Sequence, residues 1–185
     1  MGTIKTTNIE TITGSGTLTL GQSGETITVP SGATINLSNA TQTGVGGTMT
    51  PAFHAYNNSG VSIPTDTATK VTNLNEVFDT DSAFASSRFT VPSGQGGKYF
   101  IYGGVSFGSD VAYPHCIFYI NGAQSFNSED NALSMGSTMR AAVSHKIFNL
   151  SASDYVELYT FQGSGATNTQ SSGRTFFGGY KIIGA

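Results

Sequence analysis

Apolar side chains recur at every second position in short segments from Pro51 onward, and Gly, Ser or Asn separates one segment from the next. Alternation with a period of two is typical of β-strands, and these separators are typical of turns. No segment shows a convincing helical period. The pattern predicts an all-β, antiparallel sandwich or jelly roll, with strands near residues 52–57, 70–71, 76–78, 88–91, 98–107, 115–120, 124–128, 139–150, 155–161 and 175–183.

Two of these segments, residues 98–107 and 155–161, carry aromatic side chains on both faces. A strand of a monomeric antiparallel sandwich is apolar on one face only, because its other face meets water. A second buried surface, such as a subunit interface, would account for the aromatic side chains on the other face. The simpler alternative is that these tyrosines lie on the surface with solvated hydroxyls. The residues assigned to this interface are Phe100, Tyr102, Tyr155, Tyr159, Phe161 and Tyr180.

Three eight-residue units open at Ser15, Ser23 and Ser31, each with a Ser-Gly pair and two aliphatic residues spaced by two. Each Ser-Gly indicates a turn, and each aliphatic pair indicates a short strand. A repeat this short cannot bury its apolar face alone, but three chains wound around one axis can. We therefore favour a fibrous β-stem over edge strands of the head or a flexible tail. The aliphatic pairs are Leu18 and Leu20, Ile27 and Val29, and Ile35 and Leu37.

The Gly-rich run at residues 44–47 separates these repeats from an aromatic region that holds all 12 Phe and all 8 Tyr. We expect three parts: an anchoring segment at residues 1–14, the stem and its linker at 15–48, and the jelly-roll head at 49–185. The lone Cys116 excludes an intrachain disulfide framework, so packing or oligomerisation must stabilise the fold.

Charged residues make up only 10% of the chain, and 8 Lys and Arg stand against 11 Asp and Glu. A nucleic-acid-binding protein needs a basic stripe to displace counterions from phosphates, so no nucleic-acid partner is expected. No run of about 18 apolar residues is present, and no membrane insertion is expected. The N-terminus lacks the hydrophobic core of a secretion signal. If the protein works outside a cell, we expect it to arrive by a route other than ordinary secretion, and release within a virion is one such route.

Six segments taken in order resemble the globular domain of the complement-Q/tumour-necrosis-factor superfamily, in the variant found in environmental phage and bacterial proteins. The resemblance covers residues 51–184, and it departs from the family at residues 93–96, where the turn is longer. It implies a compact homotrimer in which aromatic strand faces meet on a three-fold axis. The segments are residues 51–56, 77–80 with Phe84, 88–92, 97–100, 154–158 and 176–183.

The start of the chain, including residues 3–10 and 14–20, resembles the N-termini of short structural proteins of marine and cyanobacterial phages. Together the two resemblances imply a non-enzymatic, trimeric virion protein on the particle exterior. Its N-terminal segment would hold other virion proteins. Two roles remain possible: a fibre or appendage tip that contacts the host surface, and a capsid or neck decoration protein. A polysaccharide-degrading tailspike is disfavoured.

His115 and Cys116 are adjacent, which suggests a nucleophile and a base. Neighbouring side chains of a strand point to opposite faces, so the pair cannot meet, and Cys116 is expected in the core. No complete catalytic or phosphate-binding motif is present, and no enzymatic activity is expected. In a trimer, one histidine from each chain, either His54 or His145, could form a three-histidine zinc site. A structural role for both histidines is the preferred interpretation.

Acidic side chains come close in sequence at Asp79 and Asp81 and at Glu129 and Asp130. Calcium is the cofactor that clustered carboxylates in loops would suit, with Asp79 and Asp81 as candidate ligands. Solvated turns are the preferred interpretation, because Asp commonly caps turns. No cofactor is therefore expected.

Three long polar loops, at residues 108–113, 128–138 and 162–174, are expected to gather at the end of the head opposite the stem. Loops of this kind suit hydrogen bonding to a host glycan or protein. The turns at residues 121–122 and 151–154 are expected at the other end, beside the C-terminus. The candidate receptor contacts are Asp110, Glu129, Asp130, Asn168 and Arg174.

Overall fold

The computed structural model describes residues 23–35, 49–108, 111–127, 132–134, 140–164, 167–168 and 173–182. The chain divides into two units, Met1–Val45 and Gly46–Ala185, and each is considered by itself. No helix that could cross a membrane occurs among these residues.

In the first unit, residues 23–35 contain two turns, at Ser23-Gly24 and at Ser31-Gly32. Both glycines have positive φ angles, of 87° and 84°, in a region where L-residues pay a steric penalty. The Ser-Gly turns predicted for the second and third repeats are therefore confirmed, and the first repeat lies outside the described residues. The aliphatic side chains between and after the turns are exposed: Ile27 by 60%, Val29 by 41% and Ile35 by 61%.

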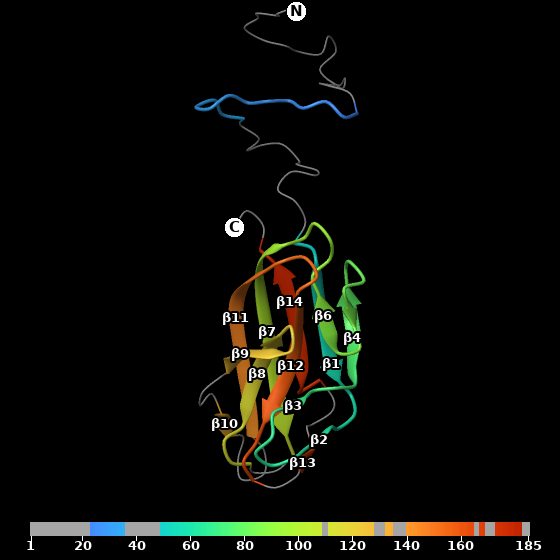
Figure 1. Ribbon diagram of the computed structural model, residues 1–185, viewed down its shortest axis with the longest axis vertical. Helices are drawn as coiled ribbons and strands as arrows, with labels where there is room; N and C mark the ends of the chain where they lie inside the picture. Colours follow the sequence, from blue (N-terminus) through green and yellow to red (C-terminus); the bar gives the residue numbers. More distant parts are fainter. Residues whose placement is uncertain are drawn as a thin grey trace, which may run out of the picture. The chain divides into compact units, whose positions relative to one another are not determined.

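The second unit, here called the head, is a sandwich of two antiparallel sheets (Figure 1). The first sheet has the strand order β10-β11-β7-β14-β1-β4. Its strands are β10 (Ala132–Ser134), β11 (Arg140–Leu150), β7 (Gly97–Phe107), β14 (Phe176–Lys181), β1 (Ala52–Asn57) and β4 (Leu74–Asp79).

The second sheet has the order β5-β6-β12-β8-β9, and β3 pairs with β12 beyond the end of β6. Its strands are β5 (Phe84–Ala85), β6 (Arg88–Thr90), β12 (Tyr155–Phe161), β8 (His115–Ile120), β9 (Ala123–Asn127) and β3 (Thr69–Lys70). A short ladder joins β13 (Thr167–Asn168) to β2 (Ser62–Ile63). From β7 onward the strands of six or more residues alternate between the two sheets, with β7, β11 and β14 in the first and β8 and β12 in the second. The predicted all-β, antiparallel jelly roll is therefore confirmed.

The strand bounds follow the sequence pattern closely. β1, β8 and β12 have the predicted bounds, and β7 differs by one residue. β2, β5, β10 and β13 were not predicted. Each has only two or three residues, which is too short for a period of two to be recognised.

The core between the sheets is rich in aromatic side chains. Phe53 lies at its centre, with ring centroids 4.5 Å from Phe89, 5.0 Å from Phe177 and 5.2 Å from Phe84. The thiol-bearing Cys116 is fully buried in the same cluster. Successive side chains of a strand point to opposite faces, so every second residue of β7 joins the core: Tyr99, Ile101, Val105 and Phe107.

The ends of the head follow from the strand registers. Gly97 pairs with Leu150 at one end of the first sheet, where the Pro51 carbonyl also accepts a hydrogen bond from the Lys181 amide. The turns at residues 121–122 and 151–154 meet there, because the Asn121 side chain donates to Asp154 at 2.8 Å. At the opposite end, the Gly163 amide donates to the carbonyl of Ala112 at 2.7 Å. The two turns therefore lie together as predicted, and the described parts of the loops at 108–113 and 162–174 meet at the other end. The third loop of the predicted group, at 128–138, lies mostly outside the described residues.

Candidate functional site

The outward side of the first sheet carries a cluster of rings that does not belong to the core. We call it the aromatic face, and it comprises His54, Phe78, Phe100, Tyr102, Phe176 and Tyr180. Neighbouring rings in this cluster lie between 5.5 and 6.4 Å apart, centroid to centroid. Phe78 is 46% exposed, and Ile147 on the adjacent β11 is 54% exposed. Large apolar side chains are thus presented to solvent in one contiguous area.

Two glycines allow these rings to lie against the sheet. A Cβ atom at Gly104 would come within 2.6 Å of the Phe176 ring, and one at Gly178 would collide with the Tyr102 ring. Any larger residue would therefore displace those rings outward. Glycine in a strand interior often marks such a close approach, and here it keeps the aromatic face flat.

His54 and Tyr102 supply the polar atoms at the middle of the aromatic face. The distance from His54 Nδ1 to the Tyr102 hydroxyl is 3.1 Å. Burial lowers the pKa of His54, and burial, followed by the charge interaction with Tyr180, raises the pKa of Tyr102. Both groups are therefore neutral near pH 7, and the central area of this face carries no formal charge.

The outward side of the second sheet has a different chemistry. The rings of Tyr119 and Tyr159 are stacked with centroids 3.8 Å apart, and the guanidinium of Arg88 lies 4.0 Å from the centre of the Tyr155 ring. His115 and Phe161 form a third pair at 5.5 Å. The rings are interspersed with charged side chains, unlike those of the aromatic face.

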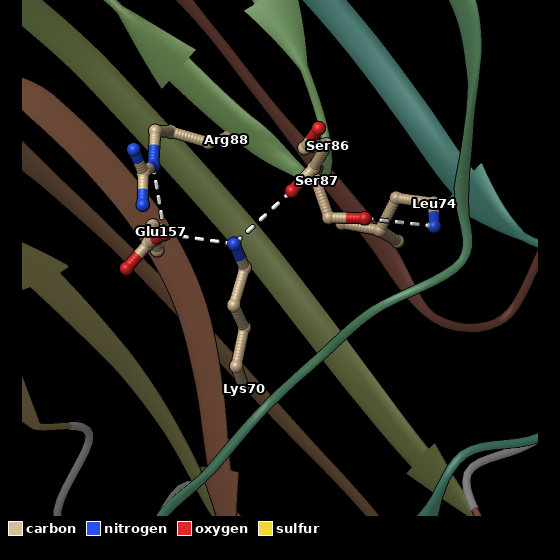
Figure 2. Close-up of polar contacts among 6 residues, drawn as sticks. All are labelled: Lys70, Leu74, Ser86, Ser87, Arg88 and Glu157. Atoms are coloured by element: carbon tan, nitrogen blue, oxygen red, sulfur yellow. Dashed lines mark hydrogen bonds and ion pairs between the residues drawn. The ribbon is translucent and has the colours of Figure 1, made fainter.

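Glu157 organises the charges on this side, as Figure 2 shows. Its Oε1 atom lies 2.7 Å from Lys70 Nζ and 2.8 Å from Arg88 Nε, and the residue is only 3% exposed. Burial alone would raise the pKa of the carboxyl, but the hydrogen bonds and the positive charges of Lys70 and Arg88 together outweigh burial, and the pKa falls below its usual value. The carboxylate is therefore ionised and paired at neutral pH.

The same network holds the turn between β5 and β6. Ser86 and Ser87 both have positive φ angles, of 52° and 55°, as the two-residue turns of tight hairpins require. Lys70 Nζ donates to the Ser86 carbonyl at 3.0 Å, and the Leu74 amide donates to Ser87 Oγ at 3.1 Å (Figure 2). Sequence reasoning missed this network, since Glu157 lies 87 and 69 residues from its partners.

The structure divides the predicted interface residues into two groups. Phe100, Tyr102 and Tyr180 belong to the first sheet and point away from the core. The second group, on β12 of the second sheet, points outward on the opposite side of the sandwich. The two groups therefore do not share a surface within one protomer, because the core lies between them, and the assignment of the six residues to a trimer interface stays a prediction. The second group is Tyr155, Tyr159 and Phe161.

The predicted receptor contacts lie mostly outside the described residues: Asp110, Glu129 and Asp130 are among those. Asn168 belongs to β13 and pairs with Ser62 in β2. Arg174 is exposed at the end of the head that carries the loops at 108–113 and 162–174. Their role in binding stays a prediction.

The candidate calcium ligands lie at the end of β4: Asp79 is its last residue, and Asp81 lies in the turn that follows. Asp79 accepts hydrogen bonds from the backbone amides of Asp81, at 3.2 Å, and of Phe84, at 2.7 Å. Thr80 Oγ1 donates to the Asp81 carboxylate at 2.5 Å. Within the described part of the chain, no group of three or more His, Cys, Asp or Glu side chains is placed to hold a metal ion. These hydrogen bonds are the ones expected of turn-capping carboxylates.

His115 and Cys116 point to opposite faces of β8, as predicted. Cys116 is buried in the core, and burial raises the pKa of its thiol. The His115 ring lies against Phe161 on the outward side. His54 and His145 both lie on the outward side of the first sheet, where each contacts a ring of the aromatic face.

The head resembles several solved structures. Murine APRIL, solved at pH 5.0, is 18% identical over 71% of this chain and 98% of its own, with a TM-score of 0.54. The Eiger TNF of S. frugiperda is 14% identical over 72% of this chain and 93% of its own, with a TM-score of 0.55. The globular domain of zebrafish complement 1qA protein is 16% identical over 71% and 97%, with a TM-score of 0.48. The TM-scores of the APRIL and Eiger structures show a shared fold.

No protein-family model matches the sequence. No curated protein matches it either.

Proposed function

We propose that this chain is a non-enzymatic, homotrimeric structural protein of a bacteriophage particle, and that its protomers meet through the aromatic face of the first sheet. The composition and exposure of the aromatic face are the main support for a trimer. Its rings are flat, contiguous and uncharged, and Phe78 and Ile147 are about half exposed. Interface cores are depleted in charge and enriched in aromatic residues, and large apolar patches on a protein surface mark binding sites.

The second sheet is less suited to this contact. Its outward side contains the Lys70–Glu157–Arg88 network, and packing a protomer over Arg88 would remove charged groups from water at a cost. In the proposed trimer Tyr155, Tyr159 and Phe161 therefore lie on the outside. The resemblance to the APRIL and Eiger structures supports the fold on which this arrangement depends.

The repeat segment supports a role as a stem. Ile27, Val29 and Ile35 are exposed in the single chain, and the turns at Gly24 and Gly32 recur at an eight-residue interval. Regular aliphatic pairs that a single chain leaves in water favour burial between chains. Three strands of this kind around one axis would continue a trimeric head into a fibre.

A charge-insertion experiment tests the interface. We expect the wild-type protein to be a trimer by light scattering, with an interface above about 2,000 Å² in total. The double variant Phe78→Lys and Ile147→Lys places like charges on an exposed part of the aromatic face and should give monomers. Tyr159→Lys, on the other sheet, is the matched control and should remain trimeric. A monomeric wild type, or dissociation by Tyr159→Lys alone, would contradict the proposed interface.

The finer proposal is a fibre or appendage tip on the virion exterior that contacts the host surface through the loops at 108–113, 128–138 and 162–174. Replacing residues 162–174 with a short Gly-Ser linker should slow adsorption of the phage to host cells and leave the trimer intact. Adsorption at the normal rate would favour the other candidate, a capsid or neck decoration protein. Deletion of residues 1–47 should leave a trimeric head that no longer joins the particle.

A further inference from the structure

A groove of about 310 Å³ lies on the outward side of the second sheet, on the opposite side of the sandwich from the aromatic face. It borders the loops at 108–113 and 162–174, because His115 begins β8 and Phe161 ends β12. Its lining comes from four parts of the chain: His115 and Ile117 on β8, Phe161 on β12, Gln124 on β9, and Ala68 just before β3. Its volume falls at the lower end of the range for small-molecule sites, about 300–1,000 Å³. The groove is therefore large enough for a small ligand.

The walls of the groove combine ring surface with hydrogen-bonding groups. The Phe161 ring and the His115 imidazole lie 5.5 Å apart at an interplanar angle of 57° and form one side. Ile117, 3% exposed, forms an apolar base. Gln124 adds a primary amide, which can both donate and accept hydrogen bonds. An apolar surface with a few oriented polar groups is the usual composition of a ligand site.

The described part of this lining disfavours several ligand classes. Its described residues include no Lys or Arg to compensate the charge of an anionic ligand. They include one histidine and no carboxylate, which is too few ligands for a metal ion. The exposed Gln124 amide offers hydrogen bonds at the rim that a purely apolar ligand would not use. The described lining therefore fits best a neutral molecule with an apolar face and a hydroxylated rim.

From this lining we propose that the groove binds a neutral saccharide, with a pyranose ring against Phe161 and its hydroxyl groups hydrogen-bonded to Gln124 and His115. The C–H face of a pyranose is apolar and its rim bears hydroxyls, which match the two kinds of surface in the groove. The stacked Tyr119 and Tyr159 pair continues the ring surface along the sheet, because Tyr159 lies directly across the ladder from Ile117. A longer glycan can extend over this pair.

The site adjoins the loops proposed to contact the host, but sugar binding in the groove does not depend on that proposal. In a trimer formed through the aromatic face, the groove lies on the outside of each protomer. Three weak sites then act together, because the first contact raises the effective concentration of the others. In a monomer the same groove would bind with its single-site affinity.

Saturation-transfer difference NMR on the full-length protein tests the assignment, with D-glucose, D-galactose, N-acetyl-D-glucosamine and their oligomers as probes. We expect saturation transfer to ring protons of at least one neutral sugar. Gln124→Ala removes one hydrogen-bonding group from an exposed position and should weaken binding about two- to tenfold. Phe161→Leu keeps an apolar side chain but removes the ring, and should weaken binding by a similar factor. Asn58→Ala, an exposed amide outside the groove, should bind like the wild type.

Several results would overturn the proposal. One is the absence of transfer to every neutral probe. Another is transfer that neither Gln124→Ala nor Phe161→Leu reduces, which would place the sugar elsewhere. Transfer to N-acetylneuraminic acid without transfer to neutral sugars would show that the ligand class is wrong. Circular dichroism of each variant separates a loss of binding from a loss of fold, and Gln124→Ala alone decides the matter if Phe161→Leu is unfolded. Light scattering of the same samples shows that oligomeric state is not the cause.

Discussion

Replacement of Glu157 by Gln removes a charge that two basic side chains share. The Glu157 carboxylate accepts hydrogen bonds from Lys70 and Arg88, at 2.7 and 2.8 Å, while the residue is 3% exposed. Hydrogen bonds to charged groups contribute about 1.5–3 kcal/mol each, and breaking a fully buried pair costs about 3–5 kcal/mol. These values set the upper limit for the effect.

The solvent exposure of Lys70 and Arg88 lowers the expected loss of stability below this upper limit. The side chains of Lys70 and Arg88 are 23% and 42% exposed, so both can turn toward water when the carboxylate is lost. Gln also keeps one carbonyl oxygen that accepts a hydrogen bond. We therefore expect a loss of about 2 kcal/mol in the free energy of unfolding. For a chain of this length that corresponds to a fall of about 4–8 °C in Tm.

The pH dependence gives an independent check. The folded-state pKa of Glu157 is lowered, so its contribution to stability is present above its unfolded pKa, near 4.5, and is lost as pH falls through the folded pKa. The stability gap between wild type and Glu157→Gln should narrow below about pH 4.5. Glu76→Gln, an exposed carboxylate on β4, is the control and should change stability by less than about 0.5 kcal/mol. Urea unfolding at pH 7 and pH 3.5 measures both effects. Equal stability of wild type and Glu157→Gln at pH 7, or a gap that does not change with pH, would refute this account.

Phe53→Ala should lower the free energy of unfolding by about 3–5 kcal/mol in urea titrations, because Phe53 is 1% exposed and contacts three rings of the core. Cys116 should not react with iodoacetamide in the native protein and should react after denaturation, because it is buried and the pKa of its thiol is raised. The folded-state pKa of His54 is lowered by burial, so the free energy of unfolding should fall as pH drops below about 6.5. Unfolding monitored by circular dichroism measures this loss of stability, and the part due to His54 should be missing in His54→Gln. Reaction of Cys116 with iodoacetamide in the native protein would contradict the burial of Cys116. The same pH dependence of stability in wild type and His54→Gln would contradict the lowered pKa of His54.

The local pattern of the sequence was sufficient to predict the strands and several turns. Alternation alone separated the core residues Tyr99 and Ile101 from the outward Phe100 and Tyr102. The Asn121-Gly122 pair predicted the turn between β8 and β9, where both residues have positive φ angles. These features depend on neighbours in the chain, so short-range physical chemistry decides them.

The assignment of outward residues to a shared surface required the tertiary structure. Alternation shows that Tyr102 and Tyr159 point away from the core, but it does not show that their strands belong to different sheets. The two sides of the sandwich therefore could not be told apart from the pattern, and a single aromatic interface was predicted where there are two outward surfaces.

The same limit applies to the charged network and to the groove. Lys70, Arg88 and Glu157 come from three strands, and the groove is lined from four parts of the chain. Each of these residues is unremarkable among its sequence neighbours. Only the pairing of β12 with β3, β6 and β8 brings them within contact distance. Local propensity thus determined which residues form strands and which way they point, whereas long-range strand pairing decided which side chains meet.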